Sequence, residues 1–187
     1  MSRPRRFEPD DILDAAERVI LRVGAAGLSI DAVAKELGIS KSQVLYDHKS
    51  KSALLEAVVE RQLNKDESLL VKCISESAAS PHPELFGRIA SAERRLDDSD
   101  KAVALAITAS LASDDSIVNK MREWTKNDLE AMVHGPKPEA ALMSYLALTG
   151  FCCTELFSFY HWSDQERTKI LEGMRKMYLC YEQPISE

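Results

Sequence analysis

The chain has 187 residues, 45% of them hydrophobic, which is enough for one or two small domains with buried cores. Its formal net charge of −6 excludes a protein that is basic over its whole surface, although residues 1–51 hold nine Lys and Arg against eight Asp and Glu. A contact with nucleic acid would therefore use a local cationic edge of this near-neutral segment, because phosphate neutralisation supplies most of the affinity for DNA.

Apolar residues recur at helical rather than alternating spacing along the whole sequence. Threonine is scarce, and neither Asn-Gly nor Asp-Gly, the strongest signals of a β-hairpin, occurs. We therefore expect an all-α protein.

The chain begins with a short arm that carries Arg3, Arg5 and Arg6. Such an arm is either a solvated tail or a basic arm that contacts phosphates or the minor groove, and it can gain order only on DNA. No apolar segment follows the arginines, so the sequence does not predict a secretion signal, and we expect the protein to stay in the cytoplasm.

A first helix is expected from Pro9, because proline suits the first helical position and Asp10 and Asp11 suit the positive end of the helix dipole. The apolar stripe of this helix comprises Ile12, Ala16, Val19, Ile20 and Val23. Gly24 is expected to end it, and a short linker leads to the next helix.

Two short helices are predicted to meet at Gly38. The first is capped by Ser29, and its apolar face has the spacing i, i+3, i+4, i+7, formed by Ile30, Val33, Ala34 and Leu37. Gly38 ends it, because glycine enters the left-handed conformation of a helix C-terminus without strain.

The second short helix opens with Ser40 and Gln43, the two members of a capping box. Its outward side chains are hydrogen-bond donors, namely Lys41, Ser42, Gln43 and Tyr46. This combination is typical of a helix-turn-helix whose second helix reads DNA.

A long connector helix is expected from Lys51, capped by Ser50, to about Cys73, and prolines break the chain at 81–83. Further helices are predicted over 83–97, 101–111 and 114–134. His82, His134 and His161 lie at turns or helix ends, where exposure or a capping role is expected rather than catalysis or metal binding.

The helix predicted over 139–160 is apolar nearly all round, so every side of it must be covered. Polar residues interrupt the run too often for a membrane span, and a second copy of the chain covers it better. A last helix follows a capping box of Ser163 and Glu166, and Gly150 and Gly173 suit close helix packing. We therefore expect a homodimer built from two helices of each subunit.

The order of these parts resembles the TetR family of transcriptional regulators, and the motif covers residues 10–58. It consists of the arginine arm, an Ala-Ala-Glu helix, Gly24 to Gly27, a Ser-Ile…Val-Ala helix, Leu-Gly-Ile-Ser, Leu-Tyr and Ser-Lys…Leu-Leu. The resemblance implies a three-helix DNA-binding domain (1–50) and a six-helix domain (51–187) for effector binding and dimerisation. It also implies that the homodimer binds a palindromic operator and is released by a small, largely apolar effector, with no enzymatic activity and no cofactor or metal.

By the resemblance, the start of the second short helix reads bases, which assigns that role to Lys41, Ser42 and Gln43 beside the cap Ser40. Lysine suits guanine edges and glutamine adenine edges. Tyr46 and Lys51 would hold phosphates, and Ser29 is a further candidate phosphate contact.

Three positions depart from the family pattern. Leu45 stands where a tyrosine pair would begin, and Asp47-His48 replaces His-Phe. These departures predict weaker or altered binding to the operator. The alternative to a repressor is a dimeric ligand-binding or adaptor protein with weak or no DNA binding of its own.

Aromatic and methionine residues of the second domain are candidates for an effector pocket, although the same spacing is typical of an ordinary core. They are Phe86, Met121, Trp124, Met143, Tyr145 and Phe151. Glu155, the single charge in the apolar helix, is expected either at the rim of the dimer interface or as an anchor for a cationic effector.

The four cysteines include no C-x-x-C pair and have no histidine at metal-ligand spacing, which favours reduced thiols without a metal. A thiol enzyme using Cys152 and Cys153 is a competing hypothesis. Nothing within a helical turn would lower the pKa of a thiol, and Glu155 would raise it.

Overall fold

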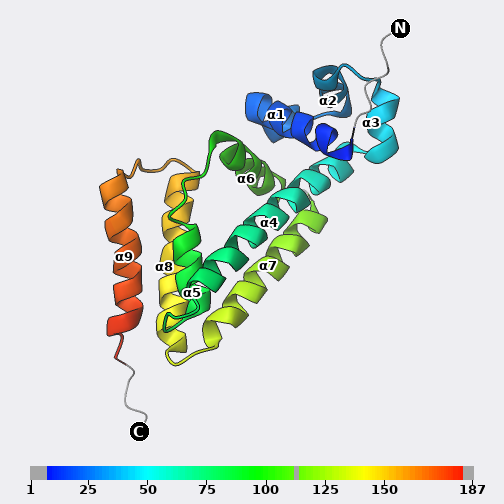
Figure 1. Cartoon of the computed structure of the whole chain (residues 1–187). Coiled ribbons are helices and arrows are strands. Elements are labelled where there is room, and N and C mark those ends of the chain that lie inside the picture. The colour runs from blue at the N-terminus through cyan, green and yellow to red at the C-terminus, as the bar shows by residue number, and fades with distance from the viewer. Residues whose placement is uncertain (1–7, 112–113, 183–187) are drawn as a thin grey trace. The chain divides into compact units, whose positions relative to one another are not determined.

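The computed structural model describes residues 8–111 and 114–182, and over these residues the chain forms nine α-helices and no strand. The all-α prediction is confirmed. The chain divides into two compact units, one of residues 1–64 and 96–119 and the other of residues 65–95 and 120–187. Figure 1 shows the labelled helices in their chain order.

The first unit is built from α1 (Pro9–Gly27), α2 (Ile30–Leu37), α3 (Lys41–Asp47), the start of α4 (Lys51–Glu76), α6 (Asp98–Ser110) and the start of α7 (Asp115–Val133). Its core contains Ile12, Ala16, Val19 and Ile20 of the predicted α1 stripe, but Val23, just before the break at Gly24, is 53% exposed and the prediction was wrong there. Apolar residues of α2 to α4 complete the core, among them Val33, Val44, Leu54 and Val58. Gly24, at φ 73°, breaks the helical path of α1 where the sequence predicts its end.

Helix α6 packs against α1 within this first unit, although it lies about seventy positions further along the chain. Its inward face consists of Asp100, Val103, Ala106, Ile107 and Ser110. By its packing, α6 therefore belongs to the same compact unit as the short helices α2 and α3. The functional division at residue 50 is a separate matter and stays a prediction.

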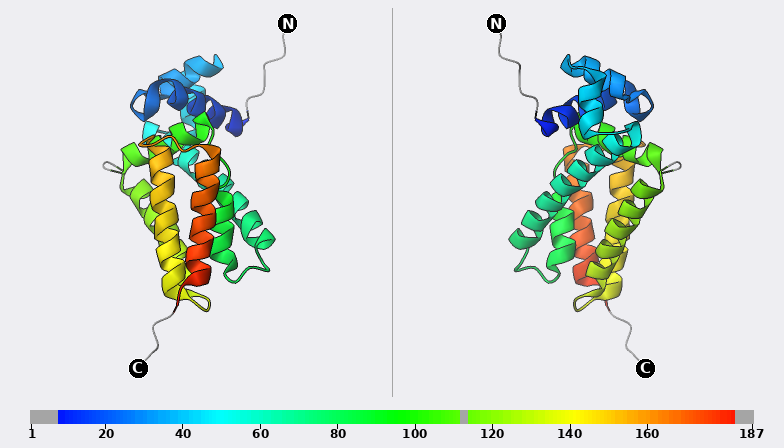
Figure 2. Two further views of the ribbon diagram at one scale, coloured as in Figure 1. Left: turned by 90° about the vertical axis from the view of Figure 1, so that its left-hand side faces the viewer. Right: turned by 90° about the vertical axis from the view of Figure 1, so that its right-hand side faces the viewer.

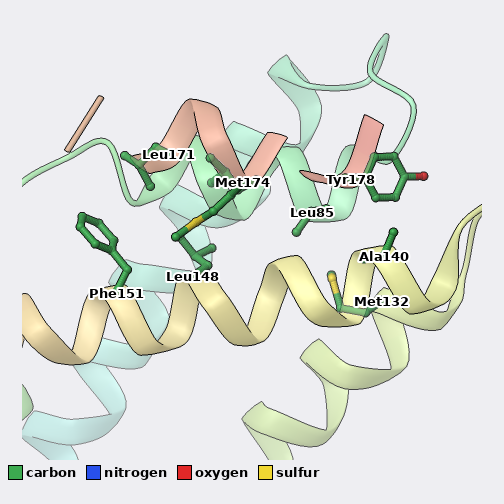
Figure 3. Packing of buried hydrophobic residues seen from close by; sticks show 10 residues of the cluster. Leu85, Met132, Ala140, Leu148, Phe151, Leu171, Met174 and Tyr178 are labelled. Carbon is green, nitrogen blue, oxygen red and sulfur yellow. The ribbon is translucent and has the colours of Figure 1, made fainter. Parts of the chain in front are cut away.

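The second unit contains α5 (Pro83–Ser91), α8 (Pro138–Leu156), α9 (Asp164–Cys180) and the remaining parts of α4 and α7. Helices α8 and α9 pack side by side (Figure 2). The buried cluster of this unit takes side chains from α5, α7, α8 and α9, and Figure 3 shows the labelled members along these helices. Leu85, Leu148, Phe151, Leu171, Met174 and Tyr178 are among them.

Three helix ends differ from the sequence expectation. Helix α5 stops at Ser91, not near Asp97, and Arg167 of α9 donates to the carbonyl oxygens of Ala92 and Glu93 just beyond it. Helix α6 starts at Asp98, because the Asp97 side chain caps it by accepting from the Asp100 N–H at 2.8 Å. The sequence expectation missed both the distant arginine and this nearby cap.

Helix α8 ends at Leu156 rather than near Tyr160. Ser158 adopts the left-handed conformation (φ 53°), and the N–H of Phe159 donates back to the carbonyl oxygen of Thr154 at 3.0 Å. This pattern satisfies a helix C-terminus and normally uses glycine.

Candidate nucleic-acid interface and effector region

Helix α3 is positioned by the turn that joins it to α2. Ser29 caps α2 by accepting from the N–H of Ala32 at 3.1 Å, and Gly38 closes it in the left-handed conformation (φ 69°). The N–H of Ile39 donates to the carbonyl oxygen of Ala34 at 3.0 Å. Both predicted caps are confirmed, and together they define the direction in which the chain enters α3.

Helix α3 begins with the predicted capping box. The Gln43 N–H donates to Ser40 Oγ at 3.3 Å, and the Ser40 N–H donates to Gln43 Oε1 at 2.9 Å. Val44 is fully buried and anchors the inner face of the helix. The opposite face therefore points away from the core of the unit.

The predicted base-reading residues Lys41, Ser42 and Gln43 are all exposed, and Tyr46 is 86% exposed. Lys41 Nζ forms an ion pair with Asp31 Oδ2 at 3.1 Å, which draws the ammonium toward the first turn of α2. The structure brings these four side chains onto one surface of a single short helix. Whether they contact DNA stays a prediction.

Lys51 lies at the first position of α4, where its Nζ donates to the carbonyl oxygen of Ala26 at 3.1 Å. An ammonium has three donors, so the lysine can also hold a phosphate. Ser50 caps α4 by accepting from the N–H of Ala53 at 3.1 Å. Arg3, Arg5 and Arg6 lie outside the described residues.

The positions that depart from the family pattern occupy the C-terminal end of α3. Leu45 is half-buried and Asp47 is exposed. The His48 Nε2 atom is buried without a hydrogen-bond partner, and burial lowers the pKa of this imidazole, while the charge of Asp47 opposes the shift. A neutral His48 contributes no positive charge to this end of the helix at neutral pH.

Two further cations of this unit are engaged in holding α1 against α2. Arg22 and Arg18 both pair with Glu36, at 2.8 and 3.2 Å. Their hydrogen bonds, from Arg22 first, lower the pKa of the Glu36 carboxyl. Because both guanidinium groups bind the same carboxylate, they stabilise the packing of α1 against α2.

The six predicted pocket residues do not converge on one point. Phe151 belongs to the buried cluster, and Phe86 and Tyr145 pack against it. Met121 and Trp124 are half-buried on α7, outside that cluster. Met143 is 58% exposed on α8, on a face about 200° away from that of Tyr145, since each residue advances a helix by about 100°.

A buried polar cluster links α5, α7 and α8. Arg88 donates to Asp128 Oδ1 from Nε and Nη2, at 3.0 and 2.6 Å, and Tyr145 Oη donates to Asp128 Oδ2 at 2.9 Å. Arg88 Nη1 donates to Glu84 Oε2 at 2.7 Å. Burial, and then the charge of Asp128, raise the pKa of Tyr145 to about 12. Sequence reasoning missed Arg88 and Asp128, since only tertiary packing brings them together.

The main contact of Glu155 is with an arginine of the same chain, which the sequence did not predict. Its carboxylate binds Arg167 of α9 through two hydrogen bonds, 2.6 and 2.9 Å long. Arg167 is buried and also stacks near the ring of Phe151, 5.8 Å from its centroid. The charge in the apolar helix is therefore neutralised within the same chain.

His82 is buried and caps α5, with Nδ1 accepting from the N–H of Leu85 at 3.1 Å. The capping role expected for a terminal histidine is confirmed at this position. An acceptor at Nδ1 requires the proton to sit on Nε2, which faces the carbonyl oxygen of Met132 at 3.4 Å.

Helices α8 and α9 carry exposed side chains at alternating spacings of three and four residues. The α8 stripe comprises Met143, Leu146, Gly150 and Cys153 and extends to Phe157, just after the helix. The α9 stripe comprises Gly173, Met177 and Cys180, with the half-buried Ile170 at its start. A Cβ atom added at Gly150 or Gly173 would meet no atom of the chain within 4 Å. Such spacing is typical of helices that pack against other helices.

The described residues contain no cluster of three or more metal-ligating side chains and no helix long and apolar enough to cross a membrane. The pKa of the Cys152 thiol is raised to about 11, first by burial and then by Glu155. A thiol in that state is a weak nucleophile at neutral pH, which counts against thiol chemistry at this position.

Two sequence profiles match the chain. Residues 12–58 match the profile described as bacterial regulatory proteins of the tetR family, and residues 87–178 match the tetracyclin repressor-like C-terminal domain. No curated protein sequence matched the chain.

Three solved structures with the same fold are 16–19% identical to the chain in sequence. A transcriptional regulator from Rhodococcus sp. Rha1 is 19% identical, with a TM-score of 0.75 over 92% of this chain and 96% of that one. A putative transcriptional regulator from Pseudomonas aeruginosa PAO1 is 16% identical, with a TM-score of 0.73 over 91% of each chain. The multidrug binding protein EbrR complexed with malachite green is 18% identical, with a TM-score of 0.69 over 93% and 98%.

Proposed function

Because the chain belongs to the TetR family of bacterial regulatory proteins, whose members are non-enzymatic DNA-binding proteins, we propose that it is a transcriptional repressor switched by a small molecule. The protein binds a palindromic operator as a homodimer, in the cytoplasm where the chromosome lies. A largely apolar effector releases it.

The surface of α3 is the single observation that supports DNA binding most strongly. Lys41, Ser42, Gln43 and Tyr46 lie exposed on a helix whose inner face is anchored by Val44. A helix-turn-helix places the start of its second helix against base edges in the major groove. In this arrangement Lys41 and Gln43 contact bases, while Tyr46 and Lys51 hold phosphates.

The exposed stripes of α8 and α9 support the homodimer. Their large apolar side chains, such as Leu146 and Met177, lack cover in the single chain, and Gly150 and Gly173 leave room for a close helix. Four such helices, two from each subunit, form a symmetric bundle. Two-fold symmetry in the protein then matches a palindromic operator.

The effector-binding role is proposed for the second unit, most of which lies within residues 87–178, the match to the tetracyclin repressor-like C-terminal profile. EbrR, which has the same fold, is described as a multidrug binding protein and has been seen with malachite green and with imidazole. An effector shifts the equilibrium only if it prefers the form of the dimer that fits the operator poorly, because equal affinity for both forms changes nothing.

A gel-shift titration with duplex DNA from the promoter beside the gene tests the DNA-binding part. We expect saturable binding that weakens steeply with salt, and a loss of about tenfold in affinity for Lys41→Ala or Tyr46→Phe. Lys72→Ala is the matched control, since Lys72 is an exposed lysine of α4 in the second unit.

The second candidate is a dimeric ligand-binding or adaptor protein. Half-buried Leu45 and exposed Asp47 favour it, because they replace a phosphate-binding hydroxyl and add a negative charge beside α3. Absence of binding even at low salt, with the dimer intact, would favour this candidate over the repressor.

A further inference from the structure

The carbonyl end of the Gln43 amide is already occupied within the protein. The Ser40 N–H donates to Gln43 Oε1 at 2.9 Å, and Ser40 Oγ donates to the same oxygen at 3.0 Å. A backbone N–H can only donate, so the amide atom that faces it must be the carbonyl oxygen. Both lone pairs of that oxygen are therefore used at the start of α3.

Reading adenine with glutamine requires both ends of the amide. The carbonyl oxygen accepts from the adenine N6 amino group while the Nε2 amino group donates to N7. In this chain only Nε2 remains available, and it is a donor. Turning the amide to read adenine would break the capping box and leave the Ser40 N–H without its partner.

Lys41 presents the same chemistry beside it. An ammonium has three donors and no acceptor, and the ion pair with Asp31 Oδ2 needs only one of the three. The two side chains expected to read bases thus both offer donors. Ser42 differs, because the Ser40 proton is used on Gln43 and the Ser42 hydroxyl must therefore donate to Ser40 Oγ, 2.9 Å away. Its oxygen remains an acceptor, so the argument concerns Lys41 and Gln43 alone.

Among the major-groove edges, guanine presents two acceptors, O6 and N7, and thymine presents one, O4. Adenine sets a donor beside its N7 acceptor, and cytosine presents a donor. We infer that α3 selects an acceptor-rich edge, guanine before thymine, at the base pairs met by Lys41 and Gln43, and that it rejects adenine there. This inference rests on the proposed function, in which α3 enters the major groove.

The variant Gln43→Glu separates the cap from the base contact. One carboxylate oxygen keeps the position of Oε1 and still accepts from the Ser40 N–H, while the other replaces the Nε2 donor with an acceptor. An acidic side chain accepts from the N4 amino group of cytosine. At the base pair read by residue 43, the preference should therefore change from guanine to cytosine.

The experiment selects binding sites for the full-length wild type and for Gln43→Glu from a pool of randomised DNA duplexes. The readout is the base preference at each position, not the overall affinity, because the added carboxylate weakens every DNA complex by repulsion from phosphates. We expect a preference of at least about fivefold for guanine in the wild type and of similar size for cytosine in the variant. Thermal melting of the two proteins should coincide, whereas Gln43→Ala, which loses the return bond to Ser40, should melt earlier.

Selection of adenine by the wild type at the position that changes in the variant would overturn the inference. An unchanged preference in Gln43→Glu would overturn it as well, since residue 43 would then not read a base. Failure of the wild type to select any sequence would overturn the proposed function first, and it is recognised before any variant is compared.

Discussion

The exposed lysine of α3, Lys41, can bind either Asp31 within the protein or, in the proposed complex, DNA. Lys41 and Asp31 are both largely exposed, with side-chain accessibilities of 56% and 71%. An exposed ion pair contributes about 0–1 kcal/mol to stability, so DNA can compete for the lysine at little cost. In the proposed complex with DNA, Asp31 is therefore expected to weaken binding slightly, while in the free protein it keeps the lysine near α2.

Asp31→Asn should raise affinity for the operator by about two- to fivefold at low salt, because Lys41 loses its intramolecular partner and a negative charge leaves the interface. The gain should shrink at high salt, where exposed charges are screened. Fluorescence anisotropy titrations at two salt concentrations measure both effects. The control is Glu172→Gln, which removes the same charge from an exposed position of α9. An equal gain in affinity there would show that the effect of Asp31→Asn does not depend on its contact with Lys41.

Tyr145 gives the buried polar cluster a pH dependence. Its pKa is raised to about 12 by burial and by Asp128, above the value near 10 that the residue has in an unfolded chain. A group whose pKa is higher in the folded protein contributes stability that is fully present below pH 10 and is lost as the pH rises toward 12.

The free energy of unfolding should therefore fall between about pH 10 and pH 12, and the fall should be shallower in Tyr145→Phe. Tyr178 and Tyr181 also have raised pKa values, so the difference between wild type and variant isolates Tyr145. Denaturant unfolding at several pH values measures it. Identical slopes for the two proteins would show that burial and Asp128 do not raise the pKa of Tyr145 in the folded state.

At the scale of elements, the crossing of α4 and α5 in the second unit depends on a missing side chain. A Cβ atom at Gly87 would lie 2.7 Å from both the N and the Cα atom of Ile74. Backbone cannot yield as a flexible side chain does, so any larger residue must push the two helices apart. Gly87 is thus the contact point between α4 and α5.

Gly87→Ala should lower the free energy of unfolding by about 1–3 kcal/mol, the usual range for overpacking, despite the better helix propensity of alanine. Gly150→Ala is the comparison, because its added methyl meets no atom of the same chain. Both changes are measured in a protein that also carries Leu146→Glu, a substitution expected below to give a monomer. Subunit association then does not contribute to the measured free energy of unfolding. A Gly87→Ala protein as stable as its parent would rule out a tight crossing.

At the scale of the whole molecule, the main exposed apolar surface of the second unit follows two helices. The α8 and α9 stripes contain large apolar side chains of which Leu146 is 52% exposed. Isolated exposed apolar residues need no explanation, but two stripes of helical spacing on adjacent helices are typical of an interface. Of the acidic residues of α9, Asp164 and Glu172 lie away from the stripe, whereas Glu166 continues its spacing at the N-terminal end of the helix.

Leu146→Glu should convert the protein from dimer to monomer, because the new carboxylates would be buried in the interface without partners. Val71→Glu is the matched control: Val71 is 60% exposed on α4, outside both stripes, and its variant should remain dimeric. Light scattering after size-exclusion chromatography distinguishes the two masses. A dimer that survives Leu146→Glu would place the interface elsewhere.

The sequence by itself determined the two short helices, α2 and α3, and the helix caps that depend on local spacing. Ser29, Gly38 and the capping boxes of Ser40 with Gln43 and of Ser163 with Glu166 act over three or four residues, so their spacing is legible without tertiary structure. For the same reason the outward surface of α3 could be predicted residue by residue, including Lys41, Gln43 and Tyr46.

Only the tertiary structure decided the contacts between residues far apart in the chain. Arg88 meets Asp128 forty positions away, α6 packs on α1, and Arg167 both neutralises Glu155 and satisfies the carbonyl oxygens after α5. Local spacing can specify a cap, but the partner of a buried charge depends on how whole helices pack.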